Sequence, residues 1–399
     1  MGNVNAAGQI LVINCGSSSI KFTLLDRGTE AVIAKGLAQR LGEPEAGIDF
    51  VIRGEKSTVA LPDGTHSNAL EGIIERLRQE FGEALQIEGV GHRIVHGGEF
   101  FSKAVLIDRA VVESIEACVT LAPLHNPAHL LGIRTALESF TKVPHVAVFD
   151  TAFHQTLPAR AFHYAIPWSF YEKRKARRYG FHGTSHQFVA QEAAHRLNRA
   201  PESLHLLTAH LGNGCSACAV REGKSADTTM GLTPLEGLVM GTRSGDVDPN
   251  LIQFMAADGL SLGEVTEILN KKSGLLGVSG LSNDMRTLQQ AAAEGHERAR
   301  LAIDLFCYRL AKALLGLAAA LDRIDALIFT GGIGENSAAV REQTLGHMRV
   351  LSPALDPALN ATHGVETNGR ITREDSGLLA MVVPTNEELM IARETAAFL

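Results

Sequence analysis

Residues 10–28 read ILVINCGSSSIKFTLLDRG, and residues 206–223 read LLTAHLGNGCSACAVREG. Each stretch has an apolar run of strand length, a tight turn of Gly, Ser and Asn, and a second apolar run that ends in a charged turn. Glycines at such turns let backbone N–H groups approach a ligand, and Ser or Asn side chains add further donors. The pair therefore predicts a duplicated ATP-binding fold with a cleft between its halves. Two ordinary hairpins are the alternative.

The bulk composition is typical of a globular protein and excludes several classes. The 399 residues are enough for two domains, each with its own core. A formal charge of −7 argues against a nucleic-acid partner. The N-terminal residues lack the basic region and apolar run of a signal peptide. No run of about 18 apolar residues exists, so we expect no membrane-spanning segment.

The five cysteines do not have the pattern of a disulfide framework. Cys215 and Cys218 form a C-x-x-C, but on a predicted strand, where the two side chains point to opposite faces. A zinc or redox site is therefore the weaker interpretation, and buried small apolar side chains are the stronger one. This usage predicts a reducing, cytoplasmic location.

Predicted strands alternate with predicted helices, and polar clusters follow the strands, which is where open α/β sheets bind ligands. We place the domain border near Asp150. Residues 1–150 with about 386–399 would form the N-terminal domain, and residues 151–385 the C-terminal domain with the nucleotide site. Expected strands cover 9–60, 90–95, 143–149, 326–330 and 381–384, and expected helices cover 67–81, 126–140, 185–197 and 297–321, with Asn126, Ser185 and Asn386 at helix starts.

The polar clusters share Gly, Asn, Ser, Arg, His and Asp, which are the residue types typical of phosphate-binding sites. Residues 16–21 lack the second Gly and the Lys-Ser/Thr end of a P-loop, and residues 332–334 lack the third Gly of a dinucleotide fingerprint. Neither a nucleophile elbow nor an H-E-x-x-H motif is present.

Taken together, the clusters resemble the acetate kinase family over nearly the whole chain. The matching stretches are VINCGSSSIKF, GHRIVHGG, APLHNP, FDTAFH, RYGFHGTSH, HLGNG, GLTPLEGLVMGTRSGD, TGGIGENS and PTNEEL. The resemblance implies a two-domain actin-like ATPase fold, a duplicated ribonuclease-H-like α/β architecture with the active site between the domains. It also implies reversible, Mg²⁺-dependent transfer of the γ-phosphoryl of ATP to acetate, giving acetyl phosphate and ADP, in a homodimer.

The resemblance also assigns residues. Arg93 and Arg243 would grip the carboxylate and the moving phosphoryl, His182 would contact that phosphoryl, and His125 would help to bind substrate. Asp150, Glu387 and Asn14 would organise Mg²⁺ or Mn²⁺. Predicted nucleotide-binding residues are Asn14, Ser17, Ser19, Lys21, His210, Gly212, Asn213, Gly214, Asp284, Met285, Arg286, Gly332, Ile333, Gly334 and Asn336. Met285 departs from the Phe that the family often has there.

An apolar pocket for the acetate methyl is implied for Val95, Leu124, Phe181 and Pro234. A carboxylic acid is already ionised at pH 7, so the acceptor needs no general base, and the mechanism is predicted to be direct in-line transfer. A propionate or other short-chain carboxylate kinase is the nearest alternative, because one methylene changes binding by only about 1–3 kcal/mol. An actin- or Hsp70-like ATPase module is the alternative from another class.

Overall fold

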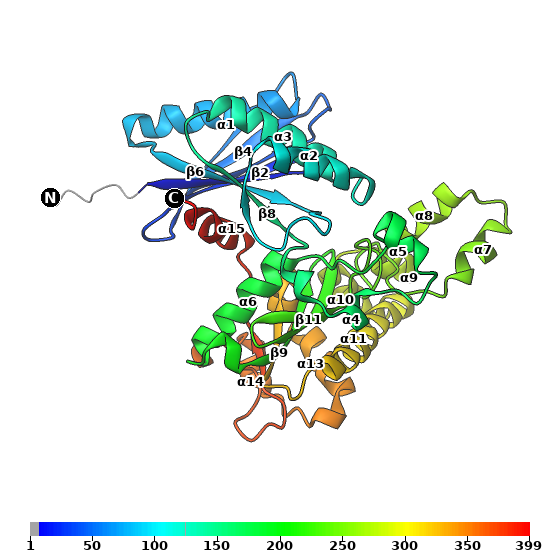
Figure 1. Ribbon diagram of the computed structural model, residues 1–399. Helices are drawn as coiled ribbons and strands as arrows, with labels where there is room; N and C mark the ends of the chain where they lie inside the picture. Colours follow the sequence, from blue (N-terminus) through cyan, green and yellow to red (C-terminus); the bar gives the residue numbers. More distant parts are fainter. Residues whose placement is uncertain (1–7, 124) are drawn as a thin grey trace. The chain divides into compact units, whose positions relative to one another are not determined.

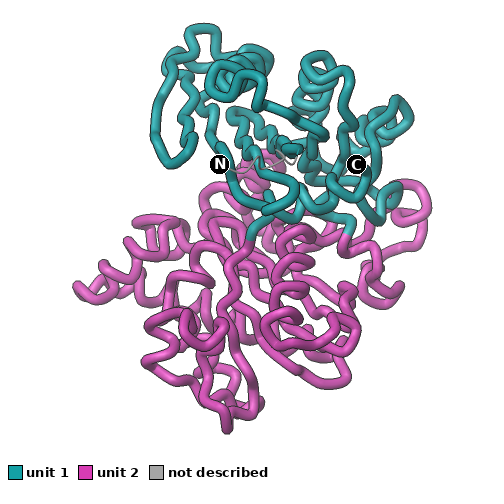
Figure 2. The backbone as a smooth tube through the Cα atoms, turned by 90° about the vertical axis from the view of Figure 1, so that its left-hand side faces the viewer, with its two compact units in different colours: residues 1–152, 386–399 teal, residues 153–385 magenta. Residues whose placement is uncertain are grey.

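The computed structural model describes residues 8–123 and 125–399. The chain folds into two compact units (Figure 2). The first unit is Met1–Ala152 together with Asn386–Leu399, and the second unit is Phe153–Thr385. The last helix of the chain thus belongs to the same unit as the first strands.

The first unit is built on an eight-stranded sheet with the order β5-β4-β3-β2-β1-β6-β8-β7. Strands β1 to β5 form an antiparallel meander, whereas β1, β6 and β8 run parallel to one another. The strands are β1 (Gln9–Cys15), β2 (Ser19–Asp26), β3 (Val32–Gln39), β4 (Gly47–Ile52), β5 (Glu55–Ala60), β6 (Ile87–Ile94), β7 (Val105–Leu106) and β8 (His145–Phe149).

Helices cover both faces of this sheet (Figure 1). One core joins Leu11 and Ile13 of β1 to Leu70 of α1 (His66–Phe81) and Ala136 of α3 (Asn126–Ser139). The alternate residues of β1 pack instead on α15 (Glu387–Ala396) through Ile391 and Ala392. Because strand side chains alternate between faces, one apolar strand supplies two cores. Helix α2 (Arg109–Ala117) packs beside α3.

The second unit has a five-stranded sheet with the order β11-β10-β9-β12-β13. Strands β9 (His205–Leu211), β10 (Cys215–Arg221) and β11 (Lys224–Thr228) are antiparallel, and β12 (Ala326–Thr330) and β13 (Ala380–Val382) run parallel to β9. The run β3-β2-β1-β6-β8 of the first unit has the same order and the same pattern of directions. The duplication predicted from the two sequence stretches is therefore present in the topology.

Helices α6 and α11 pack on the sheet of the second unit. Its helices are α4 (Ala159–Phe162), α5 (Ser169–Arg174), α6 (Gly183–Arg196), α7 (Asn250–Ala256), α8 (Leu262–Lys271), α9 (Gly274–Ser279), α10 (Met285–Ala293), α11 (Glu297–Leu317), α12 (Gly331–Asn336), α13 (Ala338–His347) and α14 (Pro357–Ala361).

Two predicted helix caps are wrong, each for a local reason. Helix α3 begins at Asn126 as expected, but His125 is its N-cap, while Asn126 is buried and donates from Nδ2 to the carbonyl oxygen of His96. Helix α6 begins after His182, whose φ of 56° lies in the left-handed region. Ser185, the predicted cap, lies inside the first turn. Asn386 does cap α15, because its side chain accepts from the N–H of Leu389.

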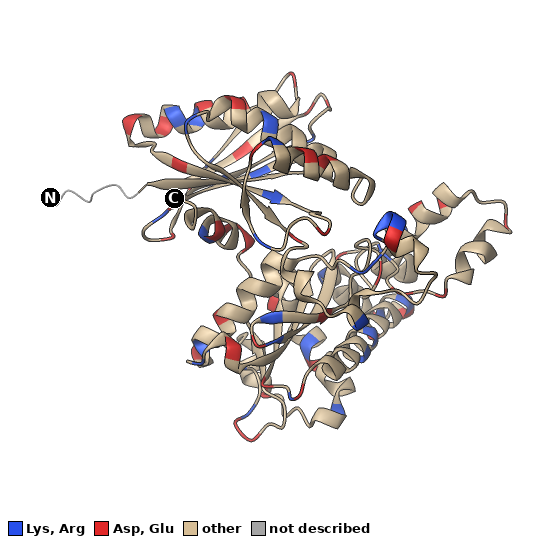
Figure 3. Cartoon of the chain, in the orientation of Figure 1, with Lys and Arg blue, Asp and Glu red and all other residues tan. Residues whose placement is uncertain are grey.

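Charged residues occur on helices and loops of both units (Figure 3). Lys173 and Arg174 lie on α5, and their side chains are exposed. Arg177 and Arg178 of the same basic run pack into the second unit. The Arg177 guanidinium carbon lies 3.7 Å from the centre of the Phe162 ring, and Arg178 forms an ion pair with Glu236. Neighbouring cations of this segment are therefore partly exposed and partly packed against the second unit. None of the helices formed by the described residues is long and apolar enough to cross a membrane.

Candidate active site

Three predicted site residues meet at the carboxyl ends of the parallel strands of the first unit. Ile13 of β1 pairs with His92 of β6, so the next residues of the two strands are Asn14 and Arg93. Ile94 of β6 pairs with Phe149 of β8, and Asp150 follows directly. The parallel register therefore places Asn14, Arg93 and Asp150 at the same carboxyl end of the sheet, with Asp150 two residues beyond Val148, the register partner of Arg93.

Arg93 and Asp150 form a bidentate ion pair. Arg93 donates from Nε to Oδ1 at 2.9 Å and from Nη2 to Oδ2 at 2.7 Å, and Asp150 is only 2% exposed. Glu387, at the start of α15, has Oε2 3.9 Å from Arg93 Nε. Burial raises the pKa of Asp150, the Arg93 guanidinium opposes this, and Glu387 adds to it. Two carboxylates thus surround one guanidinium and leave an excess of negative charge.

This donor set fits a divalent cation that arrives with a phosphate ligand. Mg²⁺ is typically held by one or two carboxylates, several waters and substrate phosphate oxygens. Asp150 and Glu387 can supply the two carboxylates, and Asn14 lies beside Arg93 at the same edge. Within residues 8–123 and 125–399, no group of three or more His, Cys, Asp or Glu side chains could form a metal cage.

The first Gly-Ser turn has an ion pair at its edge that no sequence motif indicates. Gly16 donates its N–H to the carbonyl oxygen of Ser19 at 2.7 Å, which closes the turn that carries Ser17. Lys21 faces Asn14 across the β1–β2 ladder, and its ammonium group pairs with Glu388 of α15. The lysine predicted to bind nucleotide is therefore tethered to the last helix of its own unit.

Val95 follows β6 and is buried, with 8% exposure. Its N–H donates to Nδ1 of His129 on α3 at 3.3 Å. The ring of His129 stacks on that of His125 with centroids 6.5 Å apart. Burial, with smaller contributions from Arg93 and His125, lowers the pKa of His129 to about 3, so this ring is neutral and can accept. Leu124, the next predicted pocket residue, lies outside the described residues.

In the second unit, His182 and Arg243 border a common space next to Gly214. A methyl group built on Gly214 would lie 3.4 Å from Nη1 of Arg243 and 3.6 Å from Nε2 of His182. The ring of His210 stacks on His182 with centroids 4.3 Å apart. Arg243 Nη1 lies 3.4 Å from the carbonyl oxygen of Pro234, and Phe181, which precedes His182, is buried.

Most of the predicted nucleotide-binding residues of this unit line one cavity of about 480 Å³. The cavity joins the turn after β9, the start of α10 and the Gly-rich helix α12. Asp284 caps α10 by accepting from the N–H of Thr287, and the buried Met285 follows it. The lining residues are Gly212, Asn213, Asn283, Asp284, Met285, Arg286, Gln289, Gly332, Ile333, Asn336 and Ser337.

Sequence reasoning missed Asn283, Gln289 and Ser337 in this cavity. Asn283 donates to Asn213 Oδ1 at 3.0 Å, and Gln289 donates to Ser337 Oγ at 2.8 Å. These bonds join elements distant in the chain, so spacing alone carries no signal for them. Conversely, His210, Gly214 and Gly334 belong to the predicted group but are not among the residues that line the cavity.

The strand β12 ends at Thr330, and the Gly-rich segment that follows it forms the short helix α12. Gly331 has a φ of 74°, and a side chain there would lie 2.9 Å from the backbone of Leu211. Arg341 of α13 fixes the other end of α12. It is fully buried and donates from Nη1 to the carbonyl oxygens of Gly334 at 2.8 Å and Glu335 at 2.9 Å. No motif surrounds Arg341, so nothing in the sequence marks it as a site residue.

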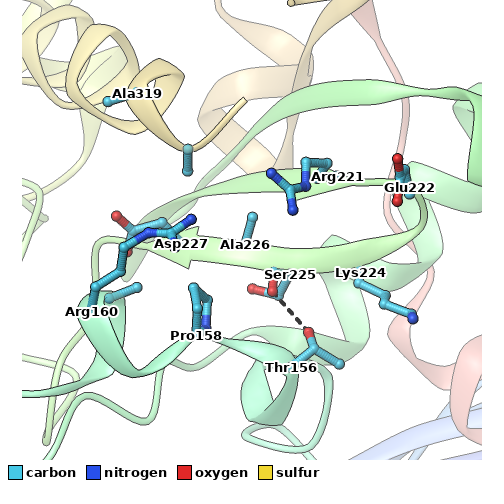
Figure 4. A pocket seen from close by; sticks show the side chains of 12 residues that line it. Thr156, Pro158, Arg160, Arg221, Glu222, Lys224, Ser225, Ala226, Asp227 and Ala319 are labelled. Carbon is cyan, nitrogen blue, oxygen red and sulfur yellow. Dashed lines mark hydrogen bonds between the residues drawn. The ribbon is translucent and has the colours of Figure 1, made fainter. Parts of the chain in front are cut away.

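A second cavity, of about 550 Å³, lies along β11 and contains none of the predicted residues (Figure 4). Its lining mixes the cations Arg160, Arg221 and Lys224 with the acids Glu222 and Asp227. Two of its lining residues are joined by a hydrogen bond, which Thr156 donates to the carbonyl oxygen of Ser225 at 2.8 Å. Because the charges nearly balance, this cavity has no clear preference for a phosphate group.

Comparison with known proteins gives one consistent answer. The model of the Acetokinase family matches residues 9–393. An acetate kinase from Deinococcus radiodurans is 53% identical over 394 residues, which cover 97% of each chain. A propionate kinase structure from Francisella tularensis superposes with a TM-score of 0.92 at 45% identity, covering 97% of this chain and 99% of that one. The Porphyromonas gingivalis acetate kinase structure gives 0.92 at 42% identity, with 98% and 99% covered. The predicted actin-like α/β fold class is confirmed.

Proposed function

Because the chain belongs to the Acetokinase family, whose members transfer phosphate to a carboxylate, we propose that it is an acetate kinase that phosphorylates acetate with ATP. The support for this comes from two features, one in each unit. One is the 480 Å³ cavity lined by the predicted nucleotide residues. The other is the Arg93–Asp150–Glu387 cluster at the sheet edge of the first unit. The products would be acetyl phosphate and ADP, and the reaction would be reversible.

The chemistry of the acceptor defines what the protein must supply. Acetate is already an anion at pH 7, so no base is needed to activate it, unlike the hydroxyl acceptor of a sugar kinase. The obstacle is repulsion between this anion and the γ-phosphoryl group. Arg93 and Arg243 would offset that repulsion and hold acceptor and phosphoryl in line, while His182 would donate to the phosphoryl oxygens.

Asp150 and Glu387, with Asn14, would hold a divalent cation, Mg²⁺ or Mn²⁺. When bound, the cation neutralises charge on the ATP phosphates. Arg93 already uses both oxygens of Asp150. Asp150 would therefore orient Arg93 as well as attract the metal, which accounts for its burial better than a role as a proton acceptor does.

Propionate is the second candidate substrate, because the propionate kinase from Francisella tularensis is similar over almost the whole chain. Val95 favours acetate in our proposal, because a branched side chain near the acceptor's methyl group leaves less room for another carbon. An ATPase module without a carboxylate acceptor does not fit the family to which the chain belongs. The homodimeric state, the cytoplasmic location and the domain limits 1–150 with 386–399 and 151–385 stay predictions.

The direct test is an ATP-dependent hydroxylamine trapping assay for acyl phosphate with acetate, propionate and butyrate. We expect acyl hydroxamate with acetate, less with propionate at equal concentration, and least with butyrate. Omission of the divalent cation should stop the reaction. No hydroxamate with any of the three acids would contradict the proposed function, and a higher kcat/KM for propionate would select the second candidate.

We expect Asp150→Asn and Glu387→Ala to remove most of the activity mainly through the metal. A carboxamide keeps the shape of Asp150 but loses the charge that attracts a cation. The Mg²⁺ concentration for half-maximal activity should rise about tenfold or more, since losing a charge-assisted contact costs roughly 1.5–3 kcal/mol. Glu116→Gln, which removes a carboxylate from a surface ion pair with Arg134, is the control. Normal turnover by Asp150→Asn at an unchanged Mg²⁺ requirement would make the metal assignment wrong.

We expect Val95→Ala to shift preference from acetate toward propionate. Removing two methyl groups makes room for one carbon, whose transfer is worth about 0.8 kcal/mol, or a several-fold change in the ratio of kcat/KM values. The change should lie mostly in KM, because the pocket contacts ground state and transition state alike. Val90→Ala, at a buried site earlier on β6, should lose a similar volume without changing the ratio. Equal ratios in wild type and Val95→Ala would exclude Val95 from the pocket.

A further inference from the structure

A chain of buried polar side chains leads inward from His182 in the second unit. Nδ1 of His182 lies 2.9 Å from Ser216 Oγ, which lies 2.8 Å from Nε2 of His186. Nδ1 of His186 lies 2.7 Å from Thr208 Oγ1, which donates to the carbonyl oxygen of Cys218 at 3.4 Å. Ser216, His186 and Thr208 are all fully buried. His186 closes the RYGFHGTSH stretch and Thr208 and Ser216 lie in the stretch 206–223, but neither the motifs nor the family resemblance assigned a role to any of the three.

The fold explains why the four side chains meet. His182 and His186 are four residues apart at the start of α6, so they lie on one face of the helix. Ser216 on β10 and Thr208 on β9 come from neighbouring antiparallel strands, and Thr208 pairs directly with Cys218. Helix α6 packs on β9, which brings the two histidines over these strands.

The chemistry of the groups gives the chain a direction. Burial, together with nearby His154 and His210, lowers the pKa of His186 well below its ordinary value, so His186 is neutral and has one N–H. A carbonyl oxygen can only accept. If Thr208 donates to Cys218, then His186 donates from Nδ1 to Thr208, Ser216 donates to His186, and His182 donates from Nδ1 to Ser216.

We propose that Ser216, oriented by His186 and Thr208, is a positioning residue that fixes Nδ1 of His182 as a hydrogen-bond donor. His182 then contacts the transferring phosphoryl group through Nε2 as an imidazolium. The inference rests on the proposed function, in which His182 contacts that group. With Nδ1 already protonated, Nε2 can donate only when the ring carries a charge, and a charged donor binds phosphate oxygens more strongly than a neutral one.

The surroundings of His182 make this acceptor important. Within the second unit, the titratable and charged neighbours of its ring include His210, stacked at 4.3 Å, and Arg243, which borders the same space beside Gly214. Beyond Ser216 lie His186 and then His154. A neighbouring guanidinium disfavours a second positive charge, whereas a hydrogen bond from the charged ring to an acceptor favours it. Ser216 provides that acceptor.

The test uses Thr208, which touches neither His182 nor the cavity. Thr208→Val keeps the side-chain shape but cannot accept from His186. His186 should then move its proton to Nε2 and donate to Ser216, and the Ser216 hydroxyl should turn its hydrogen toward His182. The imidazolium loses its acceptor, so the alkaline limb of the kcat–pH profile should move to lower pH by about one unit, which is about tenfold in kcat on that limb. Thr208→Ser should restore the wild-type limb.

A second readout does not depend on turnover. Long-range ¹H–¹⁵N spectra, with the His182 signals assigned by their loss in His182→Gln, show which nitrogen of the neutral ring carries the proton. We expect Nδ1–H in wild type and Nε2–H in Thr208→Val. If Thr208→Val does not fold, Ser216→Ala gives the same two readouts, with the limb moved in the same direction.

The outcomes separate the relay from the proposed function. An unmoved alkaline limb in a folded Thr208→Val enzyme, or Nε2–H on neutral His182 in wild type, overturns the relay while acyl phosphate formation stands. If wild type forms no acyl phosphate, the proposed function fails and the spectra alone decide whether Ser216 sets the proton on His182. A changed KM for ATP at an unchanged pH profile would also overturn the relay, because it would indicate a general structural effect.

Discussion

Arg93→Ala and Arg243→Ala should each lower kcat by about a hundredfold or more. Removing one preorganised donor from a developing anion costs roughly 2.7–4 kcal/mol in comparable sites. Both guanidiniums are held by the protein before substrate binds, Arg93 by Asp150 and Arg243 next to the Pro234 carbonyl, so neither must be reorganised at the moment of transfer. The loss should appear in kcat, because the charge that they stabilise grows in the transition state.

The two substitutions should differ in stability, which tests the ion pair separately from catalysis. Arg93→Ala leaves Asp150, only 2% exposed, without its bidentate partner. Breaking a buried pair in this way costs about 3 kcal/mol, toward the low end of the usual range because 22% of the Arg93 side chain is exposed. Arg243 leaves no such carboxylate behind among its described contacts, so Arg243→Ala should unfold at nearly the wild-type urea concentration.

The stability deficit of Arg93→Ala should also depend on pH. Burial already raises the pKa of Asp150, and loss of the guanidinium removes what opposes that rise. The folded variant then binds a proton at Asp150 more tightly than the unfolded chain does. A folded state that holds more protons gains stability as pH falls. The urea midpoint of Arg93→Ala should therefore approach that of wild type on going from about pH 8 to about pH 5.

Steady-state kinetics and urea unfolding at several pH values measure both effects. Arg109→Ala, which removes an arginine whose side chain is 93% exposed, is the matched control and should change neither quantity appreciably. Wild-type turnover by either purified, folded variant would refute its proposed role. A midpoint for Arg93→Ala that does not change with pH would mean that Asp150 does not titrate as its burial indicates.

Much of the fold follows from local patterns in the sequence. The apolar runs around residues 10–28 and 206–223 predict the β1–β2 and β9–β10 hairpins, and the structure confirms both. The continuous apolar run of β1 is also visible in the sequence, and it supplies side chains to both cores. Which strand lies beside which is not visible: four strands and a helix separate β6 from β1 in the chain, and no local pattern encodes that pairing.

The candidate site likewise contains residues that the sequence indicates and residues that it does not. Residues at strand ends and in Gly-rich turns, such as Arg93, Asp150 and Asn213, stand out because a polar group follows an apolar run. Residues that act through a bond to another element do not stand out. Ser216 and Thr208 lie inside apolar strands and could be ordinary buried hydroxyls, and the left-handed φ of His182, which shifts the start of α6, depends on tertiary contacts.

Arg341 is the clearest example of a residue that acts through bonds to other elements and that no sequence pattern marks. All five of its donors are used: Nε on Asn360 Oδ1, Nη1 on the carbonyls of Gly334 and Glu335, and Nη2 on the Asn360 carbonyl and on Nδ1 of His363. Every partner is neutral, and burial lowers the pKa of Arg341 to about 10. A guanidinium remains charged at neutral pH under these conditions, so it clamps α12 to the 357–364 segment.

Arg341→Met should therefore be the most destabilising substitution in the second unit. It leaves several buried carbonyl oxygens without a donor, each costing about 1–3 kcal/mol, so we expect a total loss of about 3–5 kcal/mol. The stability of Arg341→Lys should lie between those of wild type and Arg341→Met, because an ammonium group has three donors and no planar fork. Since α12 carries Gly332, Ile333 and Asn336 of the nucleotide cavity, the KM for ATP should rise while the KM for acetate changes little.

Urea unfolding followed by circular dichroism, with KM values for both substrates, tests this expectation. Arg349→Met removes an exposed arginine a few residues further along, whose Nε donates only to the carbonyl of Gly346, and should stay within about 0.5 kcal/mol of wild type. Peptide-resolved hydrogen exchange should show faster exchange in 331–336 and 357–364 for Arg341→Lys than for wild type. Unchanged exchange in both segments, together with an unchanged KM for ATP, would show that packing alone holds α12 in place and that the buried guanidinium is dispensable to the cavity.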